Sequence, residues 1–115
     1  MGVVERAEVW WVDLGIPFGS EPGYRRPAVV VSSNRFNRST LATVIVATIT
    51  STLRLGDAPG NVRLDQGEGG LDKPSVVNVS QILVVDRDRL VERSGQLGRA
   101  IMGNVDSGLR LVLAL

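Results

Sequence analysis

The chain has 115 residues, 43% hydrophobic and 22% charged, which is typical of one soluble globular domain. It contains no cysteine and no histidine, so disulfides, thiolate chemistry and an imidazole general base are excluded. The net charge of +1 creates no global basic field. No apolar run approaches the roughly 20 residues that cross a bilayer, and the N-terminus is unlike a signal peptide. We therefore expect a cytoplasmic protein with no metal, no cofactor and no membrane contact.

The first half of the chain predicts three strands. Residues 8–14 (EVWWVDL) are rich in β-formers, and residues 15–24 hold the Gly and Pro of a long loop. Residues 27–32 form a nearly continuous valine run, typical of a strand that is buried on both faces. Polar residues 33–40 predict a turn. Residues 41–51 (LATVIVATITS) are the clearest strand, and they end in hydroxyl side chains.

The second half predicts shorter elements separated by turns. Residues 56–60 (GDAPG) are a turn signal, followed by a short strand at 61–65 and a glycine-rich loop at 66–70. Residues 75–85 (SVVNVSQILVV) predict a strand with polar residues in its middle, and residues 86–90 a capped single turn.

The C-terminal region differs from the rest because its apolar residues recur at helical spacing. Residues 90–97 predict a last edge strand, and residues 97–115 an amphipathic helix. Short strands at turn-punctuated intervals favour a small, partly closed barrel. The predicted fold class is therefore mostly β, one domain over residues 1–115, with a C-terminal helix packed on the barrel.

Two adjacent arginines stand at the entrance of the valine-rich strand. Pro27 biases Arg26 towards extended geometry, so the Arg26 side chain should leave the strand in a fixed direction. Two interpretations are open. Arg26 pairs with a carboxylate such as Asp13 or Glu21, or its guanidinium faces a phosphate.

Other polar residues also stand at strand ends or inside strands. Residues 48–52 (TITST) place hydroxyls at the end of the strongest strand, where they either reflect the β-propensity of Thr or contact a substrate oxygen. Asn78 and Gln81 interrupt an apolar strand, and buried amides need partners. Trp10 and Trp11 point to opposite faces, one towards the core and the other available for stacking or an interface. Together these residues suit a metal-independent reaction on a phosphodiester.

Four blocks of the sequence, in this order, resemble the MazF/PemK family of toxin endoribonucleases. The resemblance implies an SH3-like small barrel with a C-terminal helix. It further implies a cytosolic homodimer that cleaves single-stranded RNA at short sequences and is neutralised by a cognate antitoxin with an acidic tail. The four blocks are AEVWWVDL, GSEPGYRRPAVVVSSN, ATVIVATITS and SVVNVSQILVVDRDRL.

The resemblance also implies the catalytic residues. It makes Arg26 and Thr50 the catalytic pair, with the ribose 2′-hydroxyl as the nucleophile and products ending in a 2′,3′-cyclic phosphate and a 5′-hydroxyl. Glu21 is the carboxylate of the matching loop and the candidate general base.

A second set of residues is expected to bind RNA. Gly19 and Ser20 belong to the family's loop, and Gln81 matches its base-contacting glutamine. The residue before Gln81 is often acidic in the family and is a serine here, which affects the expected base preference. Arg25 and Asn78 are further candidates: Arg25 precedes Arg26 at a position that varies in the family, and Asn78 is one of the polar residues that interrupt the apolar strand.

Two other functions remain open at the level of the sequence. CcdB-like toxins share the barrel but poison DNA gyrase by protein contact, which would need neither Arg26 nor Thr50. A barrel that binds nucleic acid or peptide without cleaving it is the third possibility.

The C-terminal helix carries more apolar residues than one face can bury in a small domain. These residues predict a two-fold dimer, with one Trp near the interface and an RNA groove across the dimer. The alternative is an extended or frayed end. The residues are Leu109, Leu111, Val112, Leu113 and Leu115.

Overall fold

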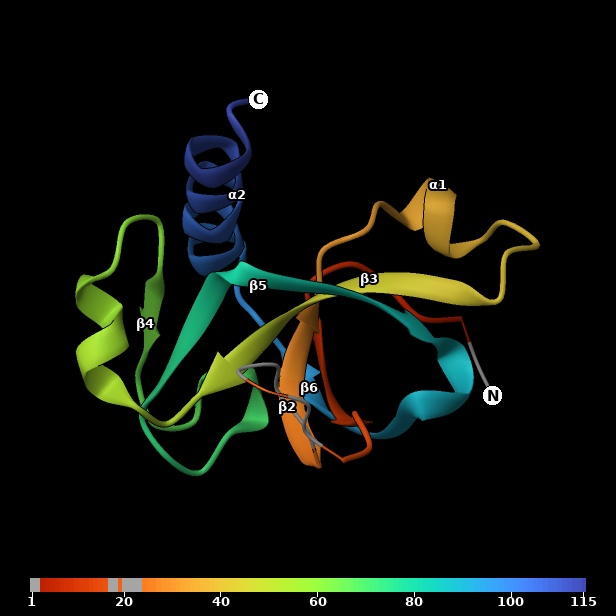
Figure 1. The fold of residues 1–115 in the computed structure, drawn as a ribbon, viewed down its shortest axis with the longest axis horizontal. Helices are drawn as coiled ribbons and strands as arrows, with labels where there is room; N and C mark the ends of the chain where they lie inside the picture. The colour runs from red at the N-terminus through yellow and green to blue at the C-terminus, as the bar shows by residue number, and fades with distance from the viewer. Residues whose placement is uncertain (1–2, 17–18, 20–23) are drawn as a thin grey trace.

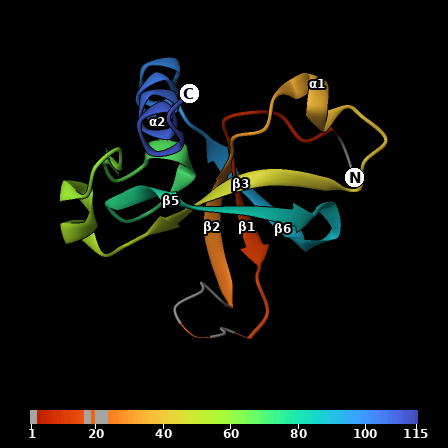
Figure 2. The same ribbon diagram turned by 45° about the horizontal axis from the view of Figure 1, so that its top comes forward.

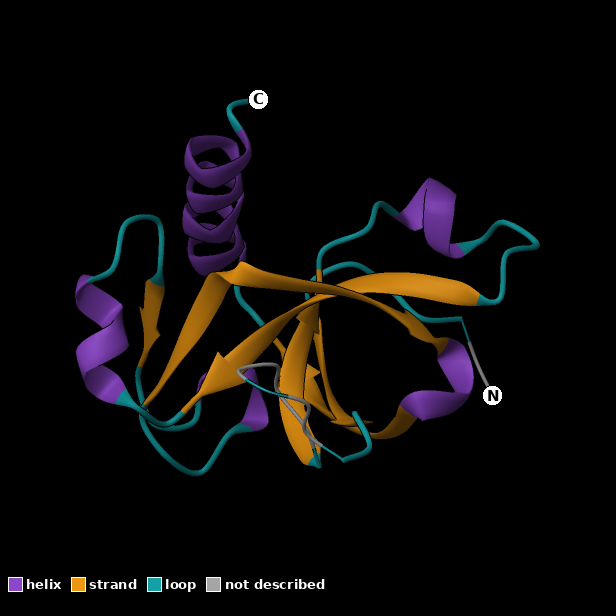
Figure 3. Cartoon of the chain, viewed as in Figure 1, coloured by secondary structure: helices purple, strands orange, loops and turns teal. Residues whose placement is uncertain are grey.

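The computed structural model describes residues 3–16, 19 and 24–115. These residues form one antiparallel six-stranded sheet with the order β4-β5-β3-β2-β1-β6 (Figures 1 and 3). The strands are β1 (Glu8–Asp13), β2 (Arg25–Val30), β3 (Thr43–Thr50), β4 (Val62–Leu64), β5 (Ser75–Asp86) and β6 (Leu90–Gln96). The helices are α1 (Asn34–Asn37) and α2 (Arg99–Leu113), with single 3₁₀ turns at η1 (Leu53–Asp57), η2 (Glu68–Gly70) and η3 (Arg87–Arg89).

The sheet is strongly curled, and Figure 2 shows α2 over one part of it and α1 over another. An irregularity between β3 and β5 contributes to the curl. Ala47 pairs with Ile82 whereas Thr48 pairs with Asn78, so the β5 residues 79–81 have no direct partner on β3. Extra residues of this kind bend a strand and increase its twist. The predicted mostly β half-barrel with a C-terminal helix is confirmed.

Each face of the sheet carries its own core, because successive strand residues point to opposite sides. Val29 belongs to the cluster beneath α2, and its neighbours Ala28 and Val30 belong to the cluster on the other face. All three are at most 1% exposed. The valine-rich strand is therefore buried on both faces, as its sequence predicts.

Helix α2 packs on the sheet through one face and leaves apolar residues uncovered on its last turns. Met102 and Val105 enter the core, and Gly108 lies so close to a loop that a Cβ there would stand 2.0 Å from the carbonyl oxygen of Gly60. Beyond this contact, Leu113 and Leu115 are 49% and 85% exposed. The amphipathic helix is confirmed, and its end carries a large accessible apolar surface.

Two elements differ from the sequence-based expectation. Strand β2 begins at Arg25 rather than Pro27, because Arg25 and Arg26 already pair with Asp13 and Val12 of β1. The polar segment 33–40 contains the single-turn helix α1, which Ser33 caps by accepting a hydrogen bond from the Phe36 amide over 3.1 Å. In the described ranges, no helix is long and apolar enough to span a bilayer.

Candidate functional site

The register of the sheet brings Arg26 and Thr50 together. Ala28 of β2 pairs with Thr48 of β3, and the strands are antiparallel. Strand alternation puts Arg26 on the face of Ala28 and Thr50 on the face of Thr48, and both residues line one pocket. Because both side chains line this pocket, they can contact one bound phosphate.

Pro27 explains why a hollow opens at this place. Proline has no amide hydrogen, and the β2–β3 ladder begins one residue later, at Ala28. Beyond that point the two strands enclose a pocket of about 390 Å³. Its lining comes from β1, β2, the end of β3 and the segment that leads into β5. The lining residues are Trp11, Arg25, Arg26, Pro27, Ile49, Thr50, Ser51, Leu71, Asp72, Lys73 and Ser75.

The Thr50 hydroxyl is held in an orientation suited to donation. The backbone amide of Thr52 donates to Thr50 Oγ1 over 3.2 Å. An oxygen that accepts in this way keeps its own hydrogen for another acceptor. The side chain can therefore donate to an oxygen of a molecule that enters the pocket.

Arg25 lines the same pocket, but its guanidinium has a protein partner. Arg25 Nη2 lies 3.2 Å from Glu92 Oε2, and both side chains are exposed. Because Arg25 and Arg26 are adjacent strand residues, they leave the sheet on opposite faces. Arg26 shares a face with Thr50 and Arg25 does not.

Asn78 and Gln81 do not line this pocket. Gln81 Oε1 accepts a hydrogen bond from Thr48 Oγ1 over 3.0 Å, and Asn78 Oδ1 accepts one from Ser80 Oγ over 2.8 Å. Thr48 and Thr50 are two residues apart and therefore share a face of β3. The hydrogen bond to Thr48 thus holds Gln81 on the face that carries Thr50, further along the sheet.

Of the three site residues predicted in the loop, the structure describes only Gly19. Ser20 and Glu21, the RNA-binding and general-base candidates of the loop, lie outside the described residues. Gly19 is described: it is exposed and has φ of +60°, a left-handed conformation that favours glycine.

Several lining residues were not singled out as site residues by the sequence. Trp11 packs against the core beneath α2 and also borders the pocket, so it is the tryptophan available to the site. Lys73 and Ser75 come from the entrance of β5. A signal for Lys73 exists in retrospect: a cation directly before a proline occurs at residues 26–27 and again at 73–74.

A network around Glu8 braces β1 against β6, away from the pocket. Glu8 is 8% exposed and accepts hydrogen bonds from the Glu5 amide, the Trp10 indole and Arg93 Nε, the last over 2.8 Å. Burial alone would raise the pKa of Glu8, but these hydrogen bonds and the Arg93 charge together lower it below its ordinary value of 4.5. In the part of the chain that the structure describes, no cluster of three acidic side chains could hold a metal ion.

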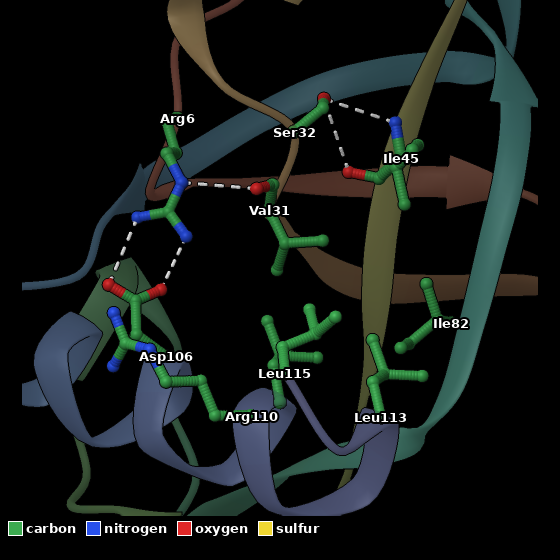
Figure 4. A pocket seen from close by; sticks show the side chains of 10 residues that line it. Arg6, Val31, Ser32, Ile45, Ile82, Asp106, Arg110, Leu113 and Leu115 are labelled. Atoms are coloured by element: carbon green, nitrogen blue, oxygen red, sulfur yellow. Dashed lines mark hydrogen bonds and ion pairs between the residues drawn. The ribbon is translucent and has the colours of Figure 1, made fainter.

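A second hollow has a different character. It is a groove of about 560 Å³ between α2 and the strands β3 and β5. Figure 4 shows Leu113 and Leu115 directed towards Ile45 and Ile82 across the groove. At one rim, Arg6 pairs with Asp106 of α2, with a further hydrogen bond from Arg6 Nε to the carbonyl of Val31 over 3.0 Å.

Comparison with known proteins identifies the family. The model of the PemK-like, MazF-like toxins of type II toxin–antitoxin systems matches residues 5–113. The chain belongs to this toxin family.

The relatives of this toxin match over nearly their whole length. Endoribonuclease MazF6 of Mycobacterium tuberculosis is 47% identical over 113 residues, which cover 98% of this chain and 99% of the relative. Endoribonuclease EndoA of Bacillus subtilis is 34% identical and covers 98% of this chain and 97% of the relative. A mycobacterial endoribonuclease in complex with its cognate antitoxin superposes with a TM-score of 0.78 at 27% identity, over 100% of this chain and 97% of that one.

Proposed function

We propose that this toxin is a metal-independent endoribonuclease that cleaves single-stranded RNA, acts in the cytoplasm as a single domain over residues 1–115, and is neutralised by a cognate antitoxin. The observation that supports the proposal is that Arg26 and Thr50, from neighbouring strands, both line a pocket of about 390 Å³. The names of the relatives support it, since MazF6 and EndoA are both called endoribonucleases.

The substrate supplies its own nucleophile in this reaction. The ribose 2′-oxygen forms a bond to the adjacent phosphorus, and the bond from phosphorus to the 5′-oxygen breaks. The 2′-hydroxyl loses its proton and the departing 5′-oxygen gains one, so the products are a 2′,3′-cyclic phosphate and a 5′-hydroxyl. No water and no oxidant are consumed. The protein therefore has to align the reacting atoms and stabilise phosphoryl charge.

Arg26 and Thr50 together stabilise the phosphoryl charge. The Arg26 guanidinium is permanently charged and donates to the non-bridging phosphoryl oxygens, where negative charge increases in the transition state. The Thr50 hydroxyl donates to one of the same oxygens. Because both groups extend from neighbouring strands, they need little reorganisation when the substrate binds.

Proton removal from the 2′-hydroxyl requires a base. Glu21 is our candidate, because it belongs to the loop that leads to Arg26. Asp72 is a second carboxylate, which lines the pocket, and it is the alternative candidate for the base. Cleavage by the Glu21→Gln and Asp72→Asn variants separates the two: only loss of the true base lowers the rate across the neutral pH range.

RNA binding is assigned to a wider surface than the pocket. We propose that Gly19, Ser20, Arg25, Asn78 and Gln81 contact the RNA, with Arg25 at the pocket and Asn78 and Gln81 on β5. Bases of a single strand can be unstacked and recognised on their edges by amides such as Gln81. Arg25, Asn78 and Gln81 each have a partner within the protein, so binding of RNA would add to or replace these contacts.

The decisive experiment is incubation of the purified toxin with single-stranded RNA in EDTA. We expect cleavage that continues in the chelator and fragments that carry 5′-hydroxyl ends, detected by their direct labelling with polynucleotide kinase. Loss of cleavage on chelation, or 5′-phosphate products, would contradict the proposal. Intact RNA under all conditions would favour the gyrase-poisoning or binding-only alternatives.

We also propose that the toxin is a homodimer that uses the groove between α2 and the sheet. Leu113, at 49% exposed, and Val84, at 67%, leave apolar surface uncovered around this groove. A second copy brings an identical apolar surface, and a two-fold contact pairs each surface with the other. Light scattering at micromolar concentration should give twice the monomer mass, whereas a stable, fully active monomer would refute the dimer.

The antitoxin is proposed to act by occupying the RNA groove. An acidic tail would meet the Arg26 side of the pocket, where it competes with the phosphates of RNA. The mycobacterial neighbour in complex with its cognate antitoxin supports such a partner. We expect the tail peptide to block RNA binding and cleavage together. Inhibition of cleavage with RNA binding intact would rule out competition.

A further inference from the structure

A third polar group reaches the pocket of Arg26 and Thr50 from a separate element. Lys73 lies in the segment before β5, three residues ahead of Val76, which pairs with Thr50. Pro74 restricts Lys73 to extended geometry. The hydroxyl of the buried Ser75 donates to the Lys73 carbonyl over 3.0 Å, which anchors the backbone at this position.

The charges around the pocket single out Lys73. Among the described residues, the lining contains three cations, Arg25, Arg26 and Lys73, against one carboxylate, Asp72. Arg25 is paired with Glu92. Among the described residues, the Lys73 ammonium is exposed and has no carboxylate within ion-pair distance. It is also the only lysine of the chain, in which every other cationic side chain is arginine.

An unpaired ammonium beside a candidate phosphate site has a plain chemical use. Lysine presents a compact point charge with three donors on a flexible stem, and it binds phosphate without the planar geometry that arginine requires. A flexible stem also allows the ammonium to follow a phosphate that is not held in one position. The neighbouring phosphates of a bound single strand are such groups.

We propose that Lys73 binds a backbone phosphate of the RNA next to the phosphate that Arg26 and Thr50 hold. This inference rests on the proposed function and adds to it a residue that positions the strand. Lys73 thereby contributes to binding of any RNA sequence, since phosphate contacts carry no sequence information.

The test uses a fluorescein-labelled, mixed-sequence 2′-O-methyl oligonucleotide, which lacks the attacking hydroxyl and cannot be cleaved. Fluorescence anisotropy gives the Kd over a series of salt concentrations for the wild type, Lys73→Gln and Lys73→Arg. Loss of one phosphate contact should reduce the slope of log Kd against log salt by about 0.7, as expected for single strands. Lys73→Arg should restore the wild-type slope.

Arg35→Gln is the matched control, because Arg35 is exposed on α1 and does not line the pocket. It removes one positive charge from the protein and should leave the slope unchanged. A wild-type slope in Lys73→Gln, or an equal fall in Arg35→Gln, would overturn the assignment of Lys73 alone. Wild-type protein that neither binds this probe nor cleaves RNA would overturn the proposed function together with the inference.

Discussion

The two hollows lie along the same strands, β3 and β5, yet they are suited to different partners. At one end, Thr50 of β3 and Ser75 of β5 contribute hydroxyls to a pocket that also holds Arg26. Further along, Ile45 of β3 and Ile82 of β5 contribute apolar side chains to the groove beside α2 (Figure 4). One pair of strands thus borders a pocket with charged and hydroxyl side chains and a groove with apolar ones, which we propose for catalysis and for protein contact respectively.

The difference shows how a small domain can separate chemistry from assembly. The polar residues lie beyond the end of the β2–β3 ladder at Ala28, so their side chains are accessible without breaking a core. The apolar residues lie where α2 leaves part of the sheet uncovered. A substitution in one hollow should therefore change one property and leave the other intact.

The largest expected effect is the loss of cleavage in Arg26→Ala and in Thr50→Ala. Removing a preorganised donor to transition-state charge costs about 2.7–4 kcal/mol, or roughly a hundredfold to a thousandfold in kcat. Both variants should keep the molecular mass of the wild type in solution. Single-turnover cleavage of a labelled RNA measures the effect.

Thr43→Ala is the control for the hydroxyl, because Thr43 begins the strand that Thr50 ends. It should retain wild-type activity. Equal loss in Thr43→Ala and Thr50→Ala would mean that the damage is to β3 as a whole and not to the pocket.

The next largest expected effect is a change in the free energy of unfolding, caused by a substitution outside both hollows. Glu8→Gln should cost about 1.5–3 kcal/mol at pH 7, because it weakens hydrogen bonds that involve a charged group. The pKa of Glu8 is lowered by folding, so its contribution is complete above the unfolded value and disappears as the pH falls through the folded value. Urea unfolding should therefore show a large difference between wild type and variant at pH 7 and a small one at pH 3. An equal difference at both pH values would show that the carboxylate charge is not the cause.

Leu113→Asp tests the apolar hollow. A carboxylate in the interface should weaken association by about tenfold or more, which corresponds to at least ~1.4 kcal/mol. Leu53→Asp is the matched control, since Leu53 is similarly exposed but lies on η1. Sedimentation at several concentrations measures the dissociation constant. An unchanged constant in Leu113→Asp would remove the groove from the interface.

The smallest effect is expected for Arg25→Ala. Its pair with Glu92 is exposed, and such pairs contribute about 0.2–1 kcal/mol. Stability should change little, and cleavage should fall far less than in Arg26→Ala. The opposite order of activities, with Arg25 essential and Arg26 dispensable, would show that the site is assigned one residue away from its true position.

Much of the architecture could be predicted because its signals are local. The valine run at 27–32 indicates a strand buried on both faces, and the apolar spacing at 97–115 indicates a helix. The turn at 86–90 follows from the capping ability of Asp86, whose side chain accepts from the Asp88 amide over 2.9 Å. The helix α1 was missed, because one turn is too short to establish a period.

The geometry of the site was harder to predict from the sequence, because it depends on the register between distant strands. Nothing local in the sequence states that Arg26 and Thr50 line one pocket, and only the resemblance suggests the pair. The hydrogen bond from Thr48 to Gln81 depends on the unpaired β5 residues 79–81, which no composition rule predicts. The accessible charge of Lys73 depends on its tertiary surroundings, because among the described residues Arg25 pairs with Glu92 whereas Lys73 has no carboxylate within ion-pair distance.

Those unpaired residues of β5 also bear on how the family can diversify. Before them the strand follows the register of Thr48 to Thr50, and after them it follows that of Thr43 to Ala47. The interruption lets each half of β5 keep its own alignment when the other half changes. If Asn78 contacts RNA and Ile82 lies in a dimer interface, as we propose, substitutions near Asn78 need not disturb Ile82. A toxin built this way could then acquire a new target sequence while its descendants continued to assemble with one another.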